Sequence, residues 1–162
     1  MKVIIATPSP YARKVRVILR EKKINFEEII DVPWNLNTLT VGFNPLRKIP
    51  ILLCDEYEPL FDSKVIAQYL DNYQPKPLFY PRNSEENISA RLVETVADGI
   101  CDAIVLVFLE NSRQETLRSK NWIKRQEEKI FEGVKYLSNY LEEKRYFVGT
   151  ILILQMYVDF PV

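Results

Sequence analysis

The stretch from Asn44 to Leu70 constrains the fold of this chain more than any other part of the sequence. It opens on Ile49-Pro50, where the tertiary amide of an X-Pro bond makes the cis form accessible and the proline ring excludes helix. The apolar run Ile51–Leu53 and the short piece Pro59–Phe61 follow, with the turn-forming pair Asp55-Glu56 between them. This order predicts two short strands joined by a tight turn.

A helix start follows the predicted hairpin. Asp62 and Ser63 stand directly before apolar residues with helical spacing, so either side chain can cap the first turn of a helix. A helix N-terminus with exposed N–H groups beside a proline turn can hold a carboxylate. The stretch therefore predicts a corner of the fold that can bind an anionic group.

The order of these pieces resembles the glutathione-binding half of the glutathione S-transferase family, of the bacterial cytosolic type with a serine in its N-terminal motif. The resemblance covers Met1 to about Gly149. It implies an α/β plus all-α fold, with a thioredoxin-like N-terminal domain followed by a helical C-terminal domain. The residues that carry it are Asn44-Pro45, Lys48-Ile49-Pro50, the hairpin, Phe61-Asp62-Ser63 and Ile66-Ala67-Gln68-Tyr69-Leu70.

Composition and charge exclude several classes of function. The chain has 22 basic and 22 acidic side chains and a formal net charge of zero, so neither nucleic acid nor an anionic membrane surface is an expected partner. The N-terminal apolar run is stopped by Pro8, and no apolar segment reaches the roughly 20 residues that cross a bilayer. We expect a cytoplasmic protein that binds no membrane.

The sequence contains no histidine, which removes serine–histidine and cysteine–histidine nucleophile pairs and imidazole metal ligands. Cys54 and Cys101 lie too far apart in sequence to form a C-x-x-C pair or a zinc knuckle, and each is interpreted as a small apolar residue. We therefore expect no metal.

The pattern before Asn44 predicts strand, helix and strand. Lys2–Ala6 is a β-branched run, Ser9-Pro10 is a good helix start, and Phe26–Ile30 is a second strand, so the two strands should be parallel. Asp31–Phe43 shows no clean period, and we expect an irregular loop with one short helix.

Breakers and long helical periods divide the chain into a thioredoxin-like domain over residues 1–76, a linker over 77–86 and an all-helical domain over 87–162. Gly99 lies inside the first long helix at a cost of about 1 kcal/mol relative to alanine, and close packing is a possible compensation.

The end of the chain departs from the resembling family. A family member carries a serine or threonine, two residues and an aspartate after its glycine, whereas this chain reads Thr150-Ile151-Leu152-Ile153. The apolar run Ile151–Val158 fits a short strand or a stub of buried helix equally well. We expect that the helical domain is incomplete, through a truncation or a shifted reading frame near Gly149.

The resemblance implies a transferase whose cosubstrate is glutathione and whose catalytic task is to stabilise the thiolate that attacks an electrophile. A hydroxyl at the start of the first helix does this in many classes, and Ser9 occupies that place. Capping of the helix is the alternative interpretation of Ser9. Thr7 and Tyr11 are competitors for the thiolate.

Other residues are assigned to glutathione by the resemblance. The backbone of Ile49, exposed by Pro50, can pair with an extended peptide. Asp62 and Ser63 are expected to hold the γ-glutamyl group, although they equally fit helix capping. Three further positions are less specific: Lys48 can reach the glycyl carboxylate or be a solvated lysine, Asp98 can help hold the ammonium or be a surface charge, and Arg47 replaces the family's usual glycine.

The electrophile pocket has no motif, and Tyr11, Trp34 and Phe108 are expected at its walls. The resemblance further implies small-molecule substrates, a role in detoxification and a homodimer. Two hypotheses of other classes remain open. One is a non-catalytic protein on the same scaffold, resembling stringent-starvation proteins, with a protein partner. The other is a structural helical adaptor.

Overall fold

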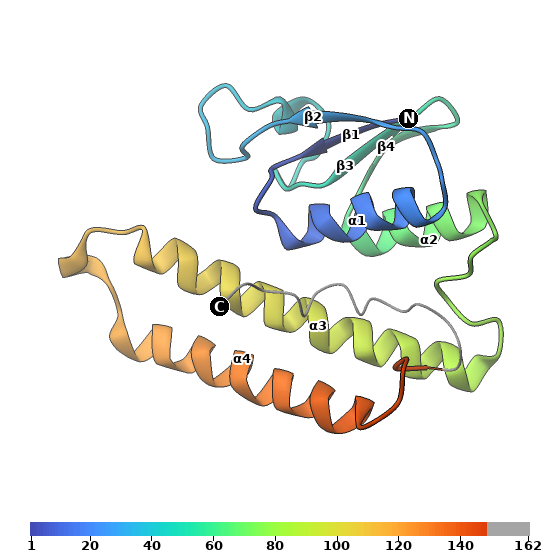
Figure 1. The fold of residues 1–162 in the computed structure, drawn as a ribbon. Coiled ribbons are helices and arrows are strands. Elements are labelled where there is room, and N and C mark those ends of the chain that lie inside the picture. The colour runs from blue at the N-terminus through green and yellow to red at the C-terminus, as the bar shows by residue number, and fades with distance from the viewer. Residues whose placement is uncertain (149–162) are drawn as a thin grey trace. The chain divides into compact units, whose positions relative to one another are not determined.

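The computed structural model describes residues 1–148, and these form two compact units, Met1–Tyr80 and residues 81–148 (Figure 1). The first unit is a small sheet with two helices, and the second is a pair of long helices. None of the helices in residues 1–148 combines the length and the apolarity needed to cross a membrane. The predictions for Thr150 and the residues that follow it lie outside the described residues.

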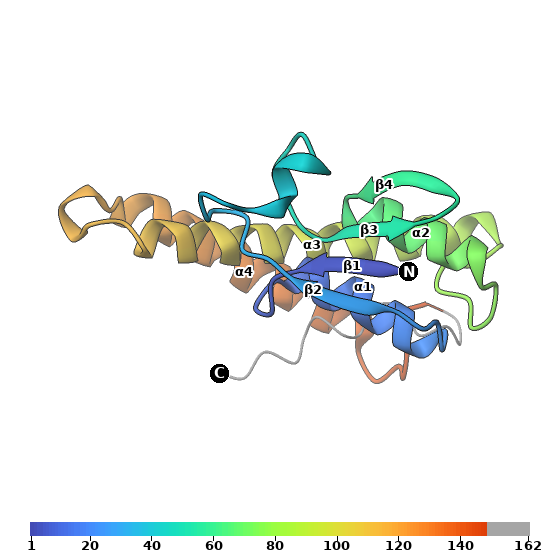
Figure 2. The same ribbon diagram turned by 90° about the horizontal axis from the view of Figure 1, so that it is seen from above.

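The sheet of the first unit has four strands, β1 (Lys2–Ile5), β2 (Glu27–Ile30), β3 (Ile51–Cys54) and β4 (Tyr57–Phe61). Their order across the sheet is β2-β1-β3-β4 (Figure 2). As predicted, β1 and β2 are parallel, because a helix connects them as a crossover. The hairpin strand β3 pairs antiparallel with both β1 and β4.

Two helices, α1 (Pro10–Glu21) and α2 (Ser63–Tyr73), cover one face of this sheet (Figures 1 and 2). Alternate residues of β1, Val3 and Ile5, point toward the helices because side chains alternate along a strand. Each fully buried aliphatic side chain stabilises the fold by about 1.5 to 3 kcal/mol. The core that they form also contains Ala12, Val15, Ile18, Leu19, Leu52, Ile66, Ala67, Leu70, Phe79 and Tyr80.

A buried ion pair holds the chain that follows α2. The ammonium of Lys22, at the C-terminus of α1, donates to Asp71 at 2.9 Å and to the carbonyls of Gln74 and Pro77, each at 2.6 Å. The Asp71 carboxylate in turn accepts the backbone N–H of Phe79 at 2.8 Å. Both ionic side chains are almost fully buried, so their charges depend on these bonds for stabilisation.

The second unit consists of α3 (Ser84–Asn111) and α4 (Lys120–Leu141), which lie side by side and are joined through a 3-10 turn at Glu115–Leu117 (Figure 1). A Cβ added to Gly133 would lie 2.6 Å from Cγ1 of Ile100, so the helices approach closely there. Gly99, for which the sequence suggested close packing, faces open space in the described part of the chain. The close approach is therefore at the other glycine.

The end of α3 is tied to the start of α4 by one carboxylate. Glu110 accepts the backbone N–H of Ser119 at 2.8 Å and two bonds from the Arg113 guanidinium at 3.0 Å. These bonds, the Ser119 N–H first, hold the pKa of the Glu110 carboxyl below its usual range. The bond from Ser119 thus fixes the connection between the two long helices.

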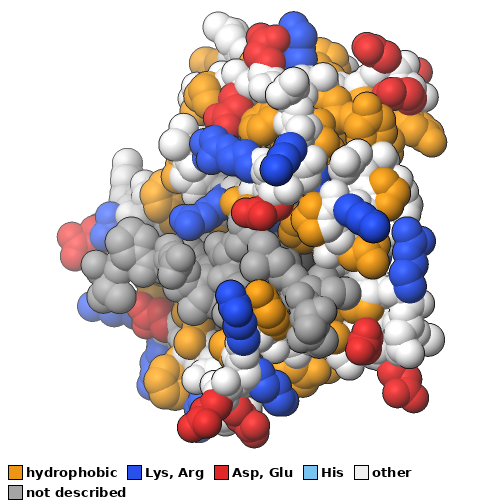
Figure 3. Space-filling model, turned by 45° about the vertical axis from the view of Figure 1, so that its right-hand side comes forward, with side chains coloured by type: hydrophobic (Ala, Val, Ile, Leu, Met, Phe, Trp, Pro, Cys, Tyr) orange, Lys and Arg blue, Asp and Glu red, His pale blue; other side chains and the backbone are white. Residues whose placement is uncertain are grey.

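The observed architecture is the one predicted from sequence, a thioredoxin-like sheet unit followed by a helical unit. The short helix expected between residues 31 and 43 is a 3-10 turn, η1 (Leu39–Gly42). Basic and acidic side chains are interspersed among the described residues on the face drawn in Figure 3.

Candidate functional site

Strand register brings the predicted glutathione-binding segments to one edge of the sheet. Ile5 at the end of β1 pairs with Ile30 at the end of β2, and Ile4 pairs with Ile51 at the start of β3. Ile51 also pairs with Phe61 at the end of β4. We call the surface formed by residues 6–10, 44–50 and 61–64 the site edge. It carries Ser9, Lys48, Ile49, Pro50, Asp62 and Ser63, all expected from sequence.

Ser9 is the N-cap of α1, and its Oγ accepts the backbone N–H of Ala12 at 3.2 Å. The cap uses a lone pair of the oxygen and leaves the O–H proton, which no described residue accepts. The side chain is half-buried at a helix N-terminus, where a negative charge is stabilised. Capping and donation to an anion are therefore compatible in this geometry.

The two competitors for the same role differ in setting. Thr7 is exposed in the turn between β1 and α1. Tyr11 is half-buried in the first turn of α1 and already has a contact within the chain. Both hydroxyls lie within two residues of Ser9, so the assignment of the thiolate partner stays a prediction.

The loop before β3 contains the Ile49–Pro50 peptide bond in the cis form. Pro50 is buried, Ile49 is half-buried, and no described residue bonds to the backbone N–H or carbonyl of Ile49. Arg47 has a φ of 52°, the left-handed region that glycine favours, at a cost of about 1 kcal/mol for a residue with a side chain. The loop thus keeps a glycine-like angle at Arg47, and Arg47 and Lys48 are both exposed.

Asp62 and Ser63 begin α2. The Asp62 carboxylate caps the helix by accepting the Lys64 N–H at 2.8 Å, and its backbone has a φ of 69°. Ser63 is buried at 5% exposure, directly behind this cap. A positive φ at a residue with a side chain stores strain, and such residues concentrate at binding sites.

The remaining predicted residues lie elsewhere. Trp34 is 61% exposed in the segment after β2. Asp98 and Phe108 are on α3 in the second unit, where Asp98 is buried and Phe108 is 58% exposed, so they are not part of the site edge. Cys54 ends β3 at the opposite end of that strand from Pro50.

A polar network behind the site edge was missed by sequence reasoning. It consists of Asp31, Thr38, Thr40 and Asn44, and we call it the loop network. Thr38 donates to the Asp31 carboxylate at 2.6 Å, and Asn44 donates from its side chain to the carbonyl of Lys48 at 2.8 Å. The signal in the sequence was the Asn44-Pro45 pair, since asparagine before a turn commonly bonds the backbone ahead of it.

The surroundings of Tyr69, on α2, make its hydroxyl less acidic. Burial raises the pKa of its hydroxyl first, and a hydrogen bond with Cys54 raises it further. The same hydroxyl donates to the Glu56 carboxylate at 3.3 Å. This cluster lies around the β3–β4 turn, away from the site edge, so it explains none of the proposed chemistry.

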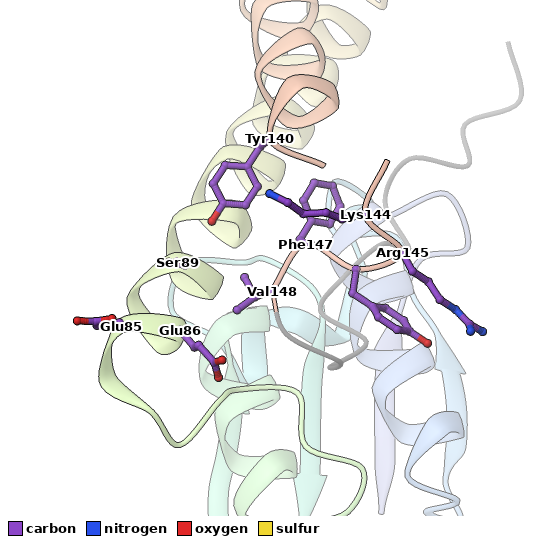
Figure 4. Close-up of a pocket in the computed structure, with 9 residues that line it drawn as sticks. Glu85, Glu86, Ser89, Tyr140, Lys144, Arg145, Phe147 and Val148 are labelled. Atoms are coloured by element: carbon purple, nitrogen blue, oxygen red, sulfur yellow. The ribbon is translucent and has the colours of Figure 1, made fainter. Parts of the chain in front are cut away.

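The second unit contains a pocket of about 430 Å³ between the start of α3 and the chain after α4 (Figure 4). It holds none of the predicted site residues. Among residues 1–148, no three or more acidic or cysteine side chains gather as a metal site. The pocket is lined by Glu85, Glu86, Ser89, Tyr140, Lys144, Arg145, Tyr146, Phe147 and Val148.

Comparison with known proteins agrees with this geometry. Residues 8–72 match the model of the glutathione S-transferase N-terminal domain. A GST-like protein of Escherichia coli, YibF, which is itself uncharacterized, is 38% identical over 141 residues, covering 87% of this chain and 70% of its own length. The chain belongs to the glutathione S-transferase family.

Solved structures of relatives extend the match in three dimensions. A glutathione S-transferase from Methylobacterium radiotolerans, in complex with glutathione sulfonate, superimposes with a TM-score of 0.89 at 40% identity, covering 94% of this chain and 72% of that one. One from Methylobacillus flagellatus with glutathione bound gives 0.87 at 34% identity, covering 91% and 73%. This chain spans only 60% of a probable glutathione S-transferase of Nicotiana tabacum, at 25% identity over 87% of this chain.

Proposed function

We propose that this protein conjugates the glutathione thiolate to an electrophilic small molecule, with Ser9 stabilising the thiolate. The site edge carries the proposal, because three features leave the sheet at the same edge: a serine at a helix N-terminus, the proline turn in which no described residue bonds the Ile49 backbone, and the Asp62-Ser63 pair. The relatives crystallised with glutathione or glutathione sulfonate support the choice of ligand.

Ser9 acts on the sulfur through its O–H. The cysteinyl thiol of glutathione releases its proton to solvent, and the thiolate then forms the carbon–sulfur bond as the leaving group departs from the electrophile. A hydrogen bond to the charged form lowers the thiol pKa, and the N-terminus of α1 stabilises the same charge. The chain has no histidine, and this role requires none.

The rest of the tripeptide lies along the edge. The backbone of Ile49 pairs with the extended peptide as a strand would. Ser63 and the first N–H groups of α2 hold the γ-glutamyl carboxylate, and the Asp62 carboxylate attracts its ammonium. Lys48 faces the glycyl carboxylate as a point charge.

The proposal keeps the further roles that the family resemblance implies. Asp98 assists with the ammonium, and Tyr11, Trp34 and Phe108 contact the electrophile. The other residues lie within the proposed glutathione-binding domain, residues 1–76, and the proposed helical domain begins at residue 87. The proposal includes a homodimer, a cytoplasmic location and a role in detoxification, and it needs no metal.

Calorimetric titration with glutathione tests the proposal, followed by a conjugation assay with an aryl halide. Binding with a dissociation constant in the millimolar range or tighter, together with turnover, is the expected result. Ser63→Ala should weaken glutathione binding while the rate at saturation stays near that of the unaltered protein. Binding without turnover would contradict the conjugation step, and absence of binding would remove the transferase and leave the non-catalytic alternative with a protein partner.

A further inference from the structure

Asn44 is more deeply embedded than a turn residue needs to be. It is only 2% exposed, and its side chain bonds at both ends: Oδ1 accepts the N–H of Leu46 at 2.9 Å, and Nδ2 donates to the carbonyl of Lys48 at 2.8 Å. Its backbone carbonyl also accepts the N–H of Arg47 at 2.9 Å. One residue, through its side chain and its carbonyl, therefore fixes most of the turn that precedes Ile49.

The carbonyl of Lys48 and the N–H of Ile49 belong to one peptide group, which is planar. When Asn44 holds that carbonyl, it also fixes the direction of the Ile49 N–H. A bond accepted by the carbonyl further polarises the same amide, which strengthens the N–H as a donor. No described residue uses this N–H.

The loop network connects Asn44 to the sheet. The N–H of Asn44 donates to the carbonyl of Thr40 at 2.8 Å, and Thr40 is fully buried. Thr38 bonds the Thr40 hydroxyl at 2.7 Å and the Asp31 carboxylate at 2.6 Å. The Asp31 N–H donates to the carbonyl of Ile5 at 2.8 Å, so the network begins at the end of β1, near Ser9.

We infer that Asn44 is a positioning residue for glutathione. By donating to the Lys48 carbonyl, Asn44 orients and polarises the Ile49 N–H, which then pairs with the bound peptide. This inference rests on the proposed function, because it concerns the same ligand. The loop network then favours extended peptides, because it raises the affinity only of a ligand that presents a carbonyl to the Ile49 N–H. A ligand that ends before the cysteinyl carbonyl gains nothing from Asn44.

The test is Asn44→Asp, which keeps an acceptor for Leu46 but loses the donor to Lys48. We expect glutathione to bind about tenfold more weakly, as loss of one well-oriented bond implies, with the rate at saturation and its pH profile unchanged. The affinity for γ-glutamylmethylamide, which lacks the cysteinyl carbonyl, should stay the same. Unchanged glutathione affinity, or equal weakening of both ligands, would overturn the inference.

A matched control separates positioning from general loss of stability. Asn83 caps α3 in the second unit by accepting the N–H groups of Glu85 and Glu86 at 2.9 and 3.2 Å, so Asn83→Ala also removes asparagine bonds. It should lower the melting temperature without weakening glutathione. Equal weakening by both variants at equal loss of melting temperature would contradict the inference.

Thr38→Val is a second test of the inference, which can be used if Asn44→Asp does not fold. Thr38 is only half-buried, and valine retains its shape while removing the hydroxyl that joins Asp31 to Thr40. A weaker glutathione complex with unaltered γ-glutamylmethylamide binding supports the network, and unaltered glutathione binding overturns it. Failure of the unaltered protein to bind glutathione would defeat the proposed function instead, so the two failures are distinguishable.

Discussion

Ser9 of the first unit and Ser119 of the second make the same bond, since each hydroxyl oxygen accepts a backbone N–H of its own helix at 3.2 Å. Their surroundings differ. Ser9 follows β1 at the site edge, beside Ile49-Pro50 and Asp62, whereas Ser119 is exposed in the connection between α3 and α4. A helix cap is therefore not a binding site by itself, and what the neighbouring strands bring to it decides its chemistry.

The same contrast extends to how the units are held together. The first unit buries polar groups behind its site edge and beneath its helices, in the loop network and in the Lys22–Asp71 pair. The second unit has close packing of α3 against α4 and a half-buried carboxylate, Glu110, that holds its connection, and the polar side chains that it buries lie on the two helices themselves, at Glu94, Asp98 and Gln126. Substitutions should therefore act through different physical causes in the two units.

The largest expected effect on stability is in the first unit. Lys22→Met removes the cation from Asp71 and the donor to the Gln74 and Pro77 carbonyls, so the free energy of unfolding should fall by about 3 kcal/mol. Urea unfolding followed by circular dichroism measures this. Lys23→Met, at the exposed neighbouring lysine, is the control and should change little. Equal effects would mean that the buried pair adds nothing.

The second unit should respond to volume rather than charge. Gly133→Val places methyl groups where Ile100 already lies 2.6 Å from the Cβ position, so unfolding should become easier by about 1 to 3 kcal/mol. Gly99→Ala meets open space and should stabilise the helix by up to about 1 kcal/mol. Thermal unfolding of the two variants measures the difference. The same sign for both would contradict the observed close approach.

The smallest effect concerns pH and the connection between α3 and α4. Because the Glu110 pKa is lower in the folded chain than in the unfolded one, its ionised form stabilises the fold above the unfolded pKa. This contribution is lost as pH falls through the folded pKa. Glu110→Gln should therefore lower the melting temperature at neutral pH and make no difference in strong acid. A difference that grows on acidification would contradict the bonds to Ser119 and Arg113.

Much of the fold was predictable because local signals and tertiary packing agree in the first unit. The proline turn, the hairpin and the caps at Ser9 and Asp62 each have a short-range physical cause. The edge that they share follows from strand register, which the parallel crossover and the hairpin together determine.

Other features depend on contacts between residues far apart in sequence. Neither Lys22 nor Asp71 carries a local sign of its partner 49 residues away. Gly99 and Gly133 look alike within their helical patterns, and only the packing of α3 on α4 distinguishes them. The loop network was missed for another reason: its side-chain bonds join residues nine or fewer positions apart, but the segment that carries them has no helical or strand period.

The most direct test of the central claim is the thiol pKa of bound glutathione, followed by thiolate absorbance as pH is varied. In the unaltered protein and in Ser119→Ala, the pKa of the bound thiol should lie clearly below that of free glutathione. In Ser9→Ala it should return toward the free value, and the conjugation rate at neutral pH should fall roughly ten- to a thousandfold. A bound thiol whose pKa is the same in Ser9→Ala and Ser119→Ala would contradict the assignment of Ser9.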